Sequence, residues 1–148
     1  MIKDRIKILK SYFTELNIDG YIIPKNDEFF SEYSEKDRLK TITNFSGSAG
    51  YAIILKNKNY LFVDGRYTIQ AQIESGKYFK IVQYEKIINC KLFKNLKIGI
   101  DPKLFTSLQI KKFFSKYNSV EKIKINLIDQ VFKNYIIKKK PFFSIKDE

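Results

Sequence analysis

Two short turns in this sequence carry residues that could bind a ligand. The first is Ser46-Gly47-Ser48-Ala49-Gly50, whose small residues permit a tight bend or a close approach of backbone. The second runs from Asp64 to Tyr67 as "DGRY" and combines a carboxylate, a glycine and an arginine. The two turns flank a segment that reads as an apolar hairpin. Four explanations could account for two such turns at the ends of one hairpin: a bound phosphate, a metal ion, a peptide substrate, or chain geometry alone.

The glycines of the first turn favour a geometric role over a phosphate site. The turn lacks the Lys-Ser/Thr pair of a P-loop and precedes an expected strand, not a helix. Without a helix N-terminus, the main device for binding an anion is missing. We expect Gly47 and Gly65 to adopt positive φ, so that valine at either position destabilises the fold by about 1–3 kcal/mol.

Arg66 is one of only three arginines in a chain that otherwise uses lysine. A guanidinium binds a carboxylate through two parallel hydrogen bonds, which lysine cannot reproduce. Asp64 could cap the helix that follows it. A ligand-binding role predicts an exposed Arg66 without a buried partner. A structural role predicts that Arg66 is enclosed and paired with Asp27 or Asp101.

The composition excludes several classes of site. There is no histidine, so a Ser-His or Cys-His nucleophile pair cannot form and the commonest transition-metal ligand is missing. Cys90 is the single cysteine, which excludes an intrachain disulfide and favours the cytoplasm. No apolar run approaches the roughly 18–20 residues that span a bilayer. The opening "MIKDRIKILK" shows no secretory signal, so we expect no membrane partner.

The net charge of +12 invites a nucleic-acid function, which we nevertheless consider unlikely. The lysines are scattered, and only Lys138, Lys139 and Lys140 form a run. Lys, Ile, Asn, Phe and Tyr are abundant while Gly, Pro, Ala and Trp are scarce, which also fits an AT-rich genome. We interpret the charge as a solvated basic surface.

Alternating helices and strands are expected to position the two turns. Hydrophobic periodicity predicts helices over residues 2–17, 37–43, 67–75, 106–117 and 128–136, and strands over 21–24, 51–56, 60–64, 78–84, 96–101 and 120–127. Ser107 is expected to cap the helix at 106–117. Because helices interleave with strands and one hairpin is present, we predict an α/β fold with a mixed sheet. Residues 1–138 would form this domain and residues 139–148 a linker toward a downstream domain.

Five segments together resemble a known family. They are "GYIIPKNDEFFSEY", "FSGSAGYAII", "FVDGRYTIQAQ", "IGIDPKLF" and "NLIDQVF". In this order and spacing the chain resembles the N-terminal domain of Xaa-Pro aminopeptidase (aminopeptidase P), of the creatinase N-terminal type, over nearly its whole length. Phe62 stands where the family often has Trp, and Asn44 where Gly is common. The resemblance implies a three-layer α/β/α domain with a ribonuclease H-like motif.

The resemblance also implies a function. Enzymes of this family are metallopeptidases that remove an N-terminal residue preceding proline. Their C-terminal domain holds two metal ions, usually manganese, on two Asp, one His and two Glu. Because this chain has no histidine, it would contain no catalytic or metal-binding residue and would be inactive alone. It would be a non-catalytic domain that shapes substrate access and assembly.

The resemblance implies as partners an aminopeptidase P catalytic domain, fused or separate, and a peptide with proline at its second position. It also allows a second copy of the chain in a homodimer. The residues implied near the substrate cleft or domain interface are Arg66, Tyr67, Asp64, Gly47 and Ser48.

Two other functions stay open from the sequence. A metal-dependent nuclease could use Asp27, Asp64 and Asp101 at strand ends, provided that carboxylates share two metals about 3.5–4 Å apart. A protein-interaction module is the other alternative, and it would dimerise without a catalytic domain.

Overall fold

The computed structural model describes residues 2–25, 37–47, 49–83, 95–109, 119–131 and 133. Its elements are α1 (Ile2–Leu16), β1 (Gly20–Pro24), α2 (Arg38–Thr43), β2 (Tyr51–Leu55), β3 (Asn59–Val63), η1 (Gly65–Tyr67), α3 (Thr68–Ser75), β4 (Lys80–Gln83), β5 (Lys97–Ile100), η3 (Pro102–Leu104) and β6 (Ser119–Lys122). A further helical segment covers residues 127–131. The sequence predictions that fall outside the described residues concern Asp27, Ser48, Cys90, residues 110–117, residues 134–136 and the linker at 139–148.

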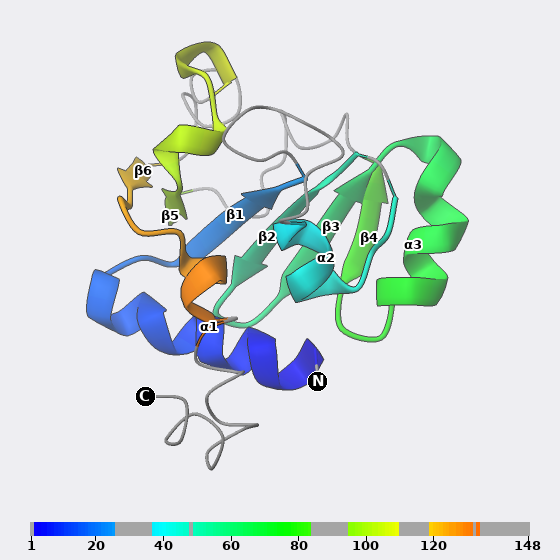
Figure 1. Ribbon diagram of the computed structural model, residues 1–148, viewed down its shortest axis with the longest axis horizontal. Coiled ribbons are helices and arrows are strands. Elements are labelled where there is room, and N and C mark those ends of the chain that lie inside the picture. The colour runs from blue at the N-terminus through cyan, green and yellow to red at the C-terminus, as the bar shows by residue number, and fades with distance from the viewer. Residues whose placement is uncertain are drawn as a thin grey trace, which may run out of the picture.

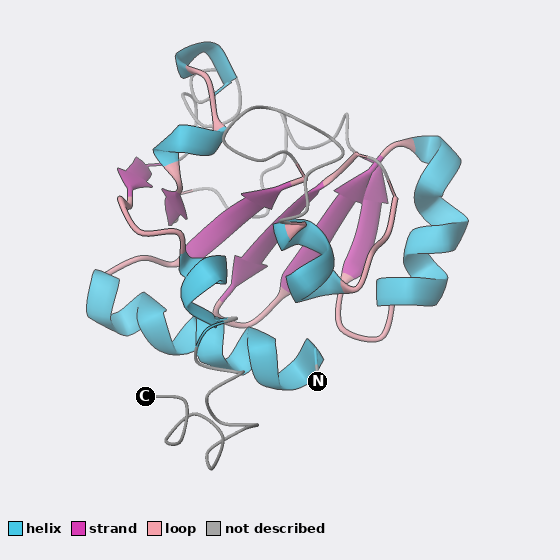
Figure 2. Ribbon diagram, in the orientation of Figure 1, coloured by secondary structure: helices cyan, strands magenta, loops and turns pink. Residues whose placement is uncertain are grey.

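The strands form one mixed sheet, as the sequence predicts. The strand order is β4-β3-β2-β1-β5-β6 in a six-stranded sheet (Figure 1). β2 pairs antiparallel with both β1 and β3, while the three remaining pairs are parallel. Figure 2 shows helices lying along this sheet. The predicted α/β class is therefore confirmed, and the described elements up to β5 follow the predicted order. The strand expected over 120–127 is shorter: β6 ends at Lys122, and the side chain of Asn126 accepts the N–H groups of Ile128 and Asp129 and so begins a helical segment there.

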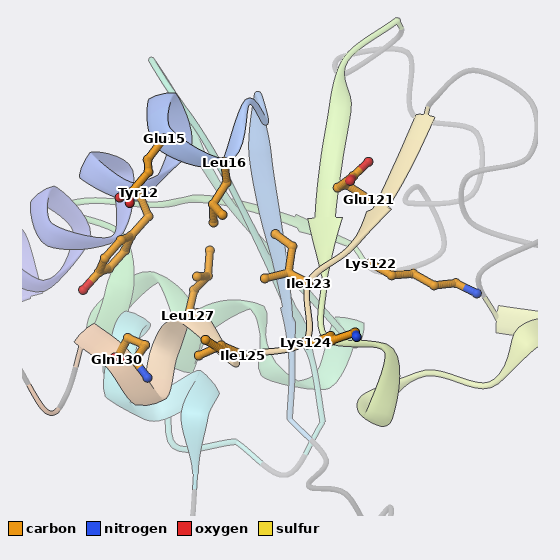
Figure 3. Close-up of a pocket in the computed structure, with 10 residues that line it drawn as sticks. All are labelled: Tyr12, Glu15, Leu16, Glu121, Lys122, Ile123, Lys124, Ile125, Leu127 and Gln130. Carbon is orange, nitrogen blue, oxygen red and sulfur yellow. The ribbon is translucent and has the colours of Figure 1, made fainter.

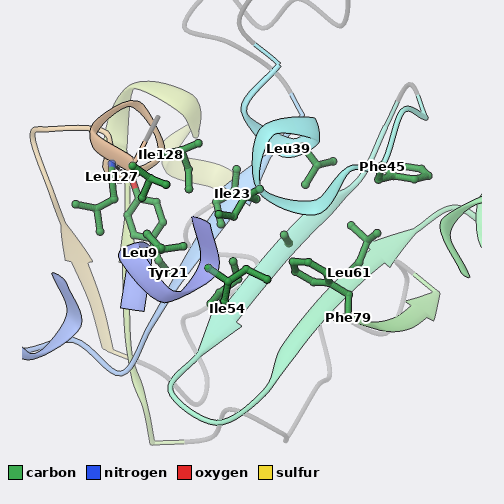
Figure 4. Packing of buried hydrophobic residues seen from close by; sticks show 14 of the residues in the cluster. Leu9, Tyr21, Ile23, Leu39, Phe45, Ile54, Leu61, Phe79, Leu127 and Ile128 are labelled. Atoms are coloured by element: carbon green, nitrogen blue, oxygen red, sulfur yellow. Dashed lines mark hydrogen bonds between the residues drawn. The ribbon is translucent and has the colours of Figure 1, made fainter. Parts of the chain in front are cut away.

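One face of the sheet is covered by α1, α2, α3 and the helical segment 127–131. Apolar residues of α1 recur at three- and four-residue steps, and Ile6, Leu9 and Phe13 are buried. They meet Leu39 of α2 and Leu127 in one core cluster, seen from close by in Figure 4. Each such side chain contributes about 1.5–3 kcal/mol by leaving water, so this cluster stabilises the packing of the helices on the sheet.

The other face of the sheet buries a second apolar cluster. Side chains alternate along a strand, so Ile22 of β1 points to this face while its neighbours Tyr21 and Ile23 belong to the first. Leu104 of η3 and the following Phe105 cover the second cluster. Burial on both faces explains why β1 is apolar throughout, without the alternation of a half-exposed strand.

Polar contacts fasten the helical segment 127–131 to the sheet. The guanidinium of Arg38, only 3% exposed, donates two hydrogen bonds of 3.0 Å to the carboxylate of Asp129. The backbone N–H of Leu127 donates to the hydroxyl of Tyr21, 3.3 Å away, and burial raises the pKa of that hydroxyl. Sequence patterns did not predict these contacts, because they join residues 91 and 106 positions apart.

The expected cap of the helix that starts at 107 is corrected by one residue. The hydroxyl of Thr106, not Ser107, accepts the backbone N–H of Gln109 at 3.1 Å. The side chain of Gln109 in turn accepts the N–H of Thr106 at 2.9 Å. This reciprocal pair is a capping box, which satisfies two backbone donors at once and therefore selects Thr106.

Candidate functional site

The two turns lie at the same end of the β2–β3 hairpin. Tyr51 at the start of β2 is paired with Phe62 near the end of β3, so the turn before β2 and the turn after β3 are neighbours. A Cβ on Gly50 would lie 3.1 Å from the carbonyl oxygen of Phe62. The backbone N–H of Lys25, just after β1, donates to the Gly50 carbonyl at 3.2 Å. The central strand β1 therefore also ends at this site.

Asp64 caps η1 and holds the backbone of the second turn. Its Oδ1 accepts the N–H of Arg66 at 2.9 Å and the guanidinium Nε of the same residue at 3.2 Å. Hydrogen bonds from the backbone and then the side chain of Arg66 lower the pKa of Asp64. The predicted capping role is confirmed, and the fork of Arg66 is engaged through only one of its three nitrogens in these contacts.

The side chain of Arg66 is 78% exposed, and its guanidinium carbon lies 5.5 Å from the centroid of the Tyr67 ring. Among the residues that the structure describes, its only carboxylate partner is the exposed Asp64. Asp101 is instead buried, and its two oxygens accept from Lys103 N–H and the Asn126 amide. Arg66 is thus neither enclosed nor paired with Asp101, and the other expected partner, Asp27, lies outside the described residues.

Gly47 is required by a close approach to Phe45. A Cβ built on Gly47 would lie 2.1 Å from Cζ of the Phe45 ring. The ring is fully buried and meets the ring of Tyr67 edge-on, with centroids 6.1 Å apart. Phe45 therefore links the first turn to the second.

The expectation of positive φ at Gly47 and Gly65 is wrong, since no described glycine has it. At Gly65 the nearest atom to a built Cβ is Nε2 of Gln83, 4.0 Å away, so a side chain fits there. The two glycines differ because only Gly47 lies against a fixed aromatic ring. Ser48 lies outside the described residues.

A hydrogen-bonded clip joins the first turn to α3. Glu74 accepts the backbone N–H of Ser46 at 3.0 Å and its hydroxyl at 2.7 Å. The amide of Gln70 donates to both residues. Partial burial raises the pKa of Glu74, but the hydrogen bonds from Ser46 and Gln70 outweigh it and lower the pKa overall. The first turn is therefore held against α3, through Gln70 in its first half and Glu74 near its end.

The described residues of this site supply hydrogen-bonding and charged groups. In the described part of the chain, no group of three or more His, Cys, Asp and Glu residues could hold a metal ion. Asp64 and Asp101, two of the three strand-end aspartates, serve as caps. Asp27, the third carboxylate of the nuclease alternative, lies outside the described residues. No helix in the described ranges has the length and apolarity to cross a membrane.

A separate groove of about 540 Å³ lies between α1 and the segment after β6 (Figure 3). Leu16 of α1 faces Ile123 and Leu127 across it, while charged residues such as Glu15 and Lys124 line its rim. It shares no residue with the two turns. Sequence reasoning missed it, because its walls come from opposite ends of the described chain.

Comparison with known proteins gives a consistent result. The model of the Creatinase/Prolidase N-terminal domain family matches residues 5–130. Xaa-Pro aminopeptidase 1 of Dictyostelium discoideum is 33% identical over 151 residues, which cover 90% of this chain and 24% of that protein. The probable Xaa-Pro aminopeptidase P of Laccaria bicolor is 30% identical over 143 residues, which cover 87% of this chain and 22% of that protein. The chain thus spans less than a quarter of the length of these relatives.

Solved structures share the fold. X-prolyl aminopeptidase from Caenorhabditis elegans, described as a cytosolic enzyme with a di-nuclear active site, superposes with a TM-score of 0.78 at 24% identity, over 90% of this chain and 26% of that one. The N-terminal domain of the cytoplasmic peptidase PepQ from Mycobacterium tuberculosis gives 0.65 at 16% identity, over 86% of this chain and 97% of that one. The second structure is of such a domain on its own, so this fold can stand alone.

Proposed function

Because the chain belongs to the creatinase/prolidase N-terminal domain family, we propose that it is the non-catalytic N-terminal domain of an Xaa-Pro aminopeptidase. In this function it shapes substrate access and assembly for a metal-dependent catalytic domain. The observation that carries the proposal is the coverage: relatives at 30–33% identity match nearly all of this chain, yet this chain is only 22–24% of their length. The domain then works in the cytoplasm, as part of or beside the rest of the enzyme.

The chain's own contribution is to bind and orient. The guanidinium of Arg66 is exposed and held by Asp64 through Nε, so its outer nitrogens can bind a peptide carboxylate or an acidic side chain. The family resemblance also implies Tyr67, Gly47 and Ser48 near the cleft. Tyr67 lies beside Arg66, the buried Gly47 would act by letting the first turn pack against Phe45, and Ser48 lies outside the described residues. The catalytic domain supplies the metal ions, with manganese expected from the family resemblance, and these ions activate the attacking water.

A chimaera tests the proposal. This chain replaces the matching N-terminal part of the Dictyostelium discoideum enzyme, and hydrolysis of an Arg-Pro-Pro peptide is measured with manganese. We expect the chimaera to turn over the peptide and the chain alone to be inactive, with or without manganese. Activity of the purified chain alone, or a folded chimaera without activity, would contradict the proposal.

Arg66 has its own test within the chimaera. Arg66→Ala should lower kcat/KM roughly tenfold, the equivalent of one charge-assisted hydrogen bond. Arg66→Lys should not restore it, because lysine lacks the planar fork. The control is Lys77→Ala, which removes a similar cation, 5.4 Å from the ring of Tyr78, at the far end of α3. If Lys77→Ala lowers activity equally, the effect is one of net charge and Arg66 has no specific role.

A further inference from the structure

Two isoleucines on the outer face of α3 are strongly exposed. Ile69 is 77% and Ile73 is 80% exposed, the highest values among the large hydrophobic residues of the described chain that are classed as exposed. They are four residues apart and so lie on one face of the helix. The opposite face of α3 packs on the sheet through Ala71 and Ser75. Figure 1 shows α3 at the β4 edge of the molecule, where its outer face is accessible.

Arg66 continues the same face. η1 runs directly into α3, and Arg66 precedes Ile69 by three residues, or about one helical turn. We call Arg66, Ile69 and Ile73 the α3 strip. It presents a cation at the end near the two turns and an apolar surface along the rest of the helix.

The charge around the α3 strip favours one kind of partner. The chain carries a net charge of +12, yet α3 itself contains no lysine or arginine. Its single acid, Glu74, is engaged by Ser46 and Gln70. A second copy of this chain would bring another +12 toward the strip and be repelled. A surface complementary to the α3 strip is apolar where it meets Ile69 and Ile73. At Arg66 it presents a carboxylate of its own or leaves room for the carboxylate of a substrate.

We propose that Ile69 and Ile73 dock against an apolar surface of the aminopeptidase catalytic domain and thereby place Arg66 at the edge of its cleft. This inference rests on the proposed function and names the surface that performs it. The two isoleucines are positioning residues, since they act through Arg66. The strip is preorganised, because the Glu74–Ser46 clip and the Phe45–Tyr67 contact already fix α3 and η1, and docking therefore loses little conformational freedom.

Cysteine reactivity tests the docking directly. Ile73→Cys is introduced into the isolated chain and into the chimaera, and its rate of labelling by a maleimide is followed by peptide mass analysis. We expect fast labelling in the isolated chain and labelling at least about tenfold slower in the chimaera, as for a site that reacts only when the interface opens. The matched control is Lys7→Cys on the exposed face of α1, which should label equally in both.

The outcomes separate this inference from the proposed function. Equal labelling of Ile73→Cys in both proteins, in a chimaera that still cleaves Arg-Pro-Pro, overturns the docking surface and leaves the proposed function standing. A folded chimaera that cannot cleave the peptide contradicts the proposed function itself. If Ile73→Cys in the isolated chain is labelled more slowly as the protein concentration rises, the α3 strip binds a second copy of the chain. This result would overturn the proposal. As an independent measurement, Ile69→Ser with Ile73→Ser should lower kcat/KM as far as Arg66→Ala, while leaving the melting temperature of the isolated chain unchanged.

Discussion

Replacing Gly47 by alanine should destabilise the protein, whereas the same change at Gly65 should not. A methyl group on Gly47 would lie 2.1–2.8 Å from three atoms of the Phe45 ring, well inside van der Waals contact. The ring is fully buried and cannot swing into solvent. At Gly65 the nearest atom to the new methyl is 4.0 Å away, which is an ordinary contact.

The magnitudes follow from these distances. Adding a methyl group to a packed core costs about 1–3 kcal/mol, and displacing the Phe45 ring also weakens its edge-on pair with Tyr67, by about 0.5–1.5 kcal/mol. Alanine also lowers the conformational entropy of the unfolded chain, which stabilises the folded state by about 0.4–1 kcal/mol at either position. The free energy of unfolding should therefore fall by about 1–4 kcal/mol for Gly47→Ala. For Gly65→Ala it should rise by about 0.4–1 kcal/mol.

Urea denaturation of the isolated chain, followed by far-UV circular dichroism, measures both changes. With a slope of about 1–3 kcal/mol per M urea, each kcal/mol shifts the urea midpoint by about 0.3–1 M, so the opposite signs are easily resolved. Phe45→Leu removes the clash, and the double variant Phe45→Leu with Gly47→Ala should be more stable than the sum of the single losses predicts. Equal stability of Gly47→Ala and Gly65→Ala, or strict additivity with Phe45→Leu, would refute the close-approach argument.

Two further predictions concern the polar contacts. Asp129→Asn should lower the free energy of unfolding by about 1–3 kcal/mol, because it removes a charge paired with the buried Arg38 while the Asp129 side chain itself is 43% exposed. Glu121→Gln, which breaks an exposed pair with Lys97, should leave the free energy of unfolding unchanged. The lowered pKa of Glu74 means that its ionised form stabilises the fold above pH 4.5, its ordinary pKa, and that this contribution is lost as the pH falls through the lowered value. Glu74→Gln should therefore weaken the dependence of the free energy of unfolding on pH in this acidic range, as measured by urea denaturation at a series of pH values. If the variant and the parent show the same pH dependence, the hydrogen bonds between Glu74 and Ser46 are not formed.

Local patterns were sufficient to predict most of the fold. The three- and four-residue spacing of Ile6, Leu9 and Phe13 identified α1, and the polar turn between two apolar runs identified the β2–β3 hairpin. These signals are short-range, because each depends on which face of a single element is buried. The strand register then shows that both turns lie at the same end of this hairpin.

The contacts that fix the site were not predictable in this way. The Arg38–Asp129 pair joins residues 91 positions apart, and no periodicity relates them. Gly47 and Gly65 look alike in sequence, since both lie in short polar turns. They differ only in the position of the Phe45 ring, which depends on the packing of the whole core. The exposure of Ile69 and Ile73 could likewise not be predicted from the sequence, because apolar residues at helical spacing predict a buried face.

Phe45 couples the stability of the fold to the geometry of the proposed site. One side of its ring covers Gly47, and its edge contacts Tyr67, whose neighbour Arg66 is the proposed ligand contact. A displaced ring should therefore move η1 as well as destabilise the core. In the chimaera, assayed well below its melting temperature, Gly47→Ala should lower kcat/KM although Gly47 touches no substrate. Ile98→Ala, which removes a buried side chain of β5 beside Gly20 at the other end of β1, should leave kcat/KM unchanged under the same conditions. If both variants lose activity in proportion to their stability, the loss reflects unfolding, and Phe45 does not transmit the core packing to Arg66.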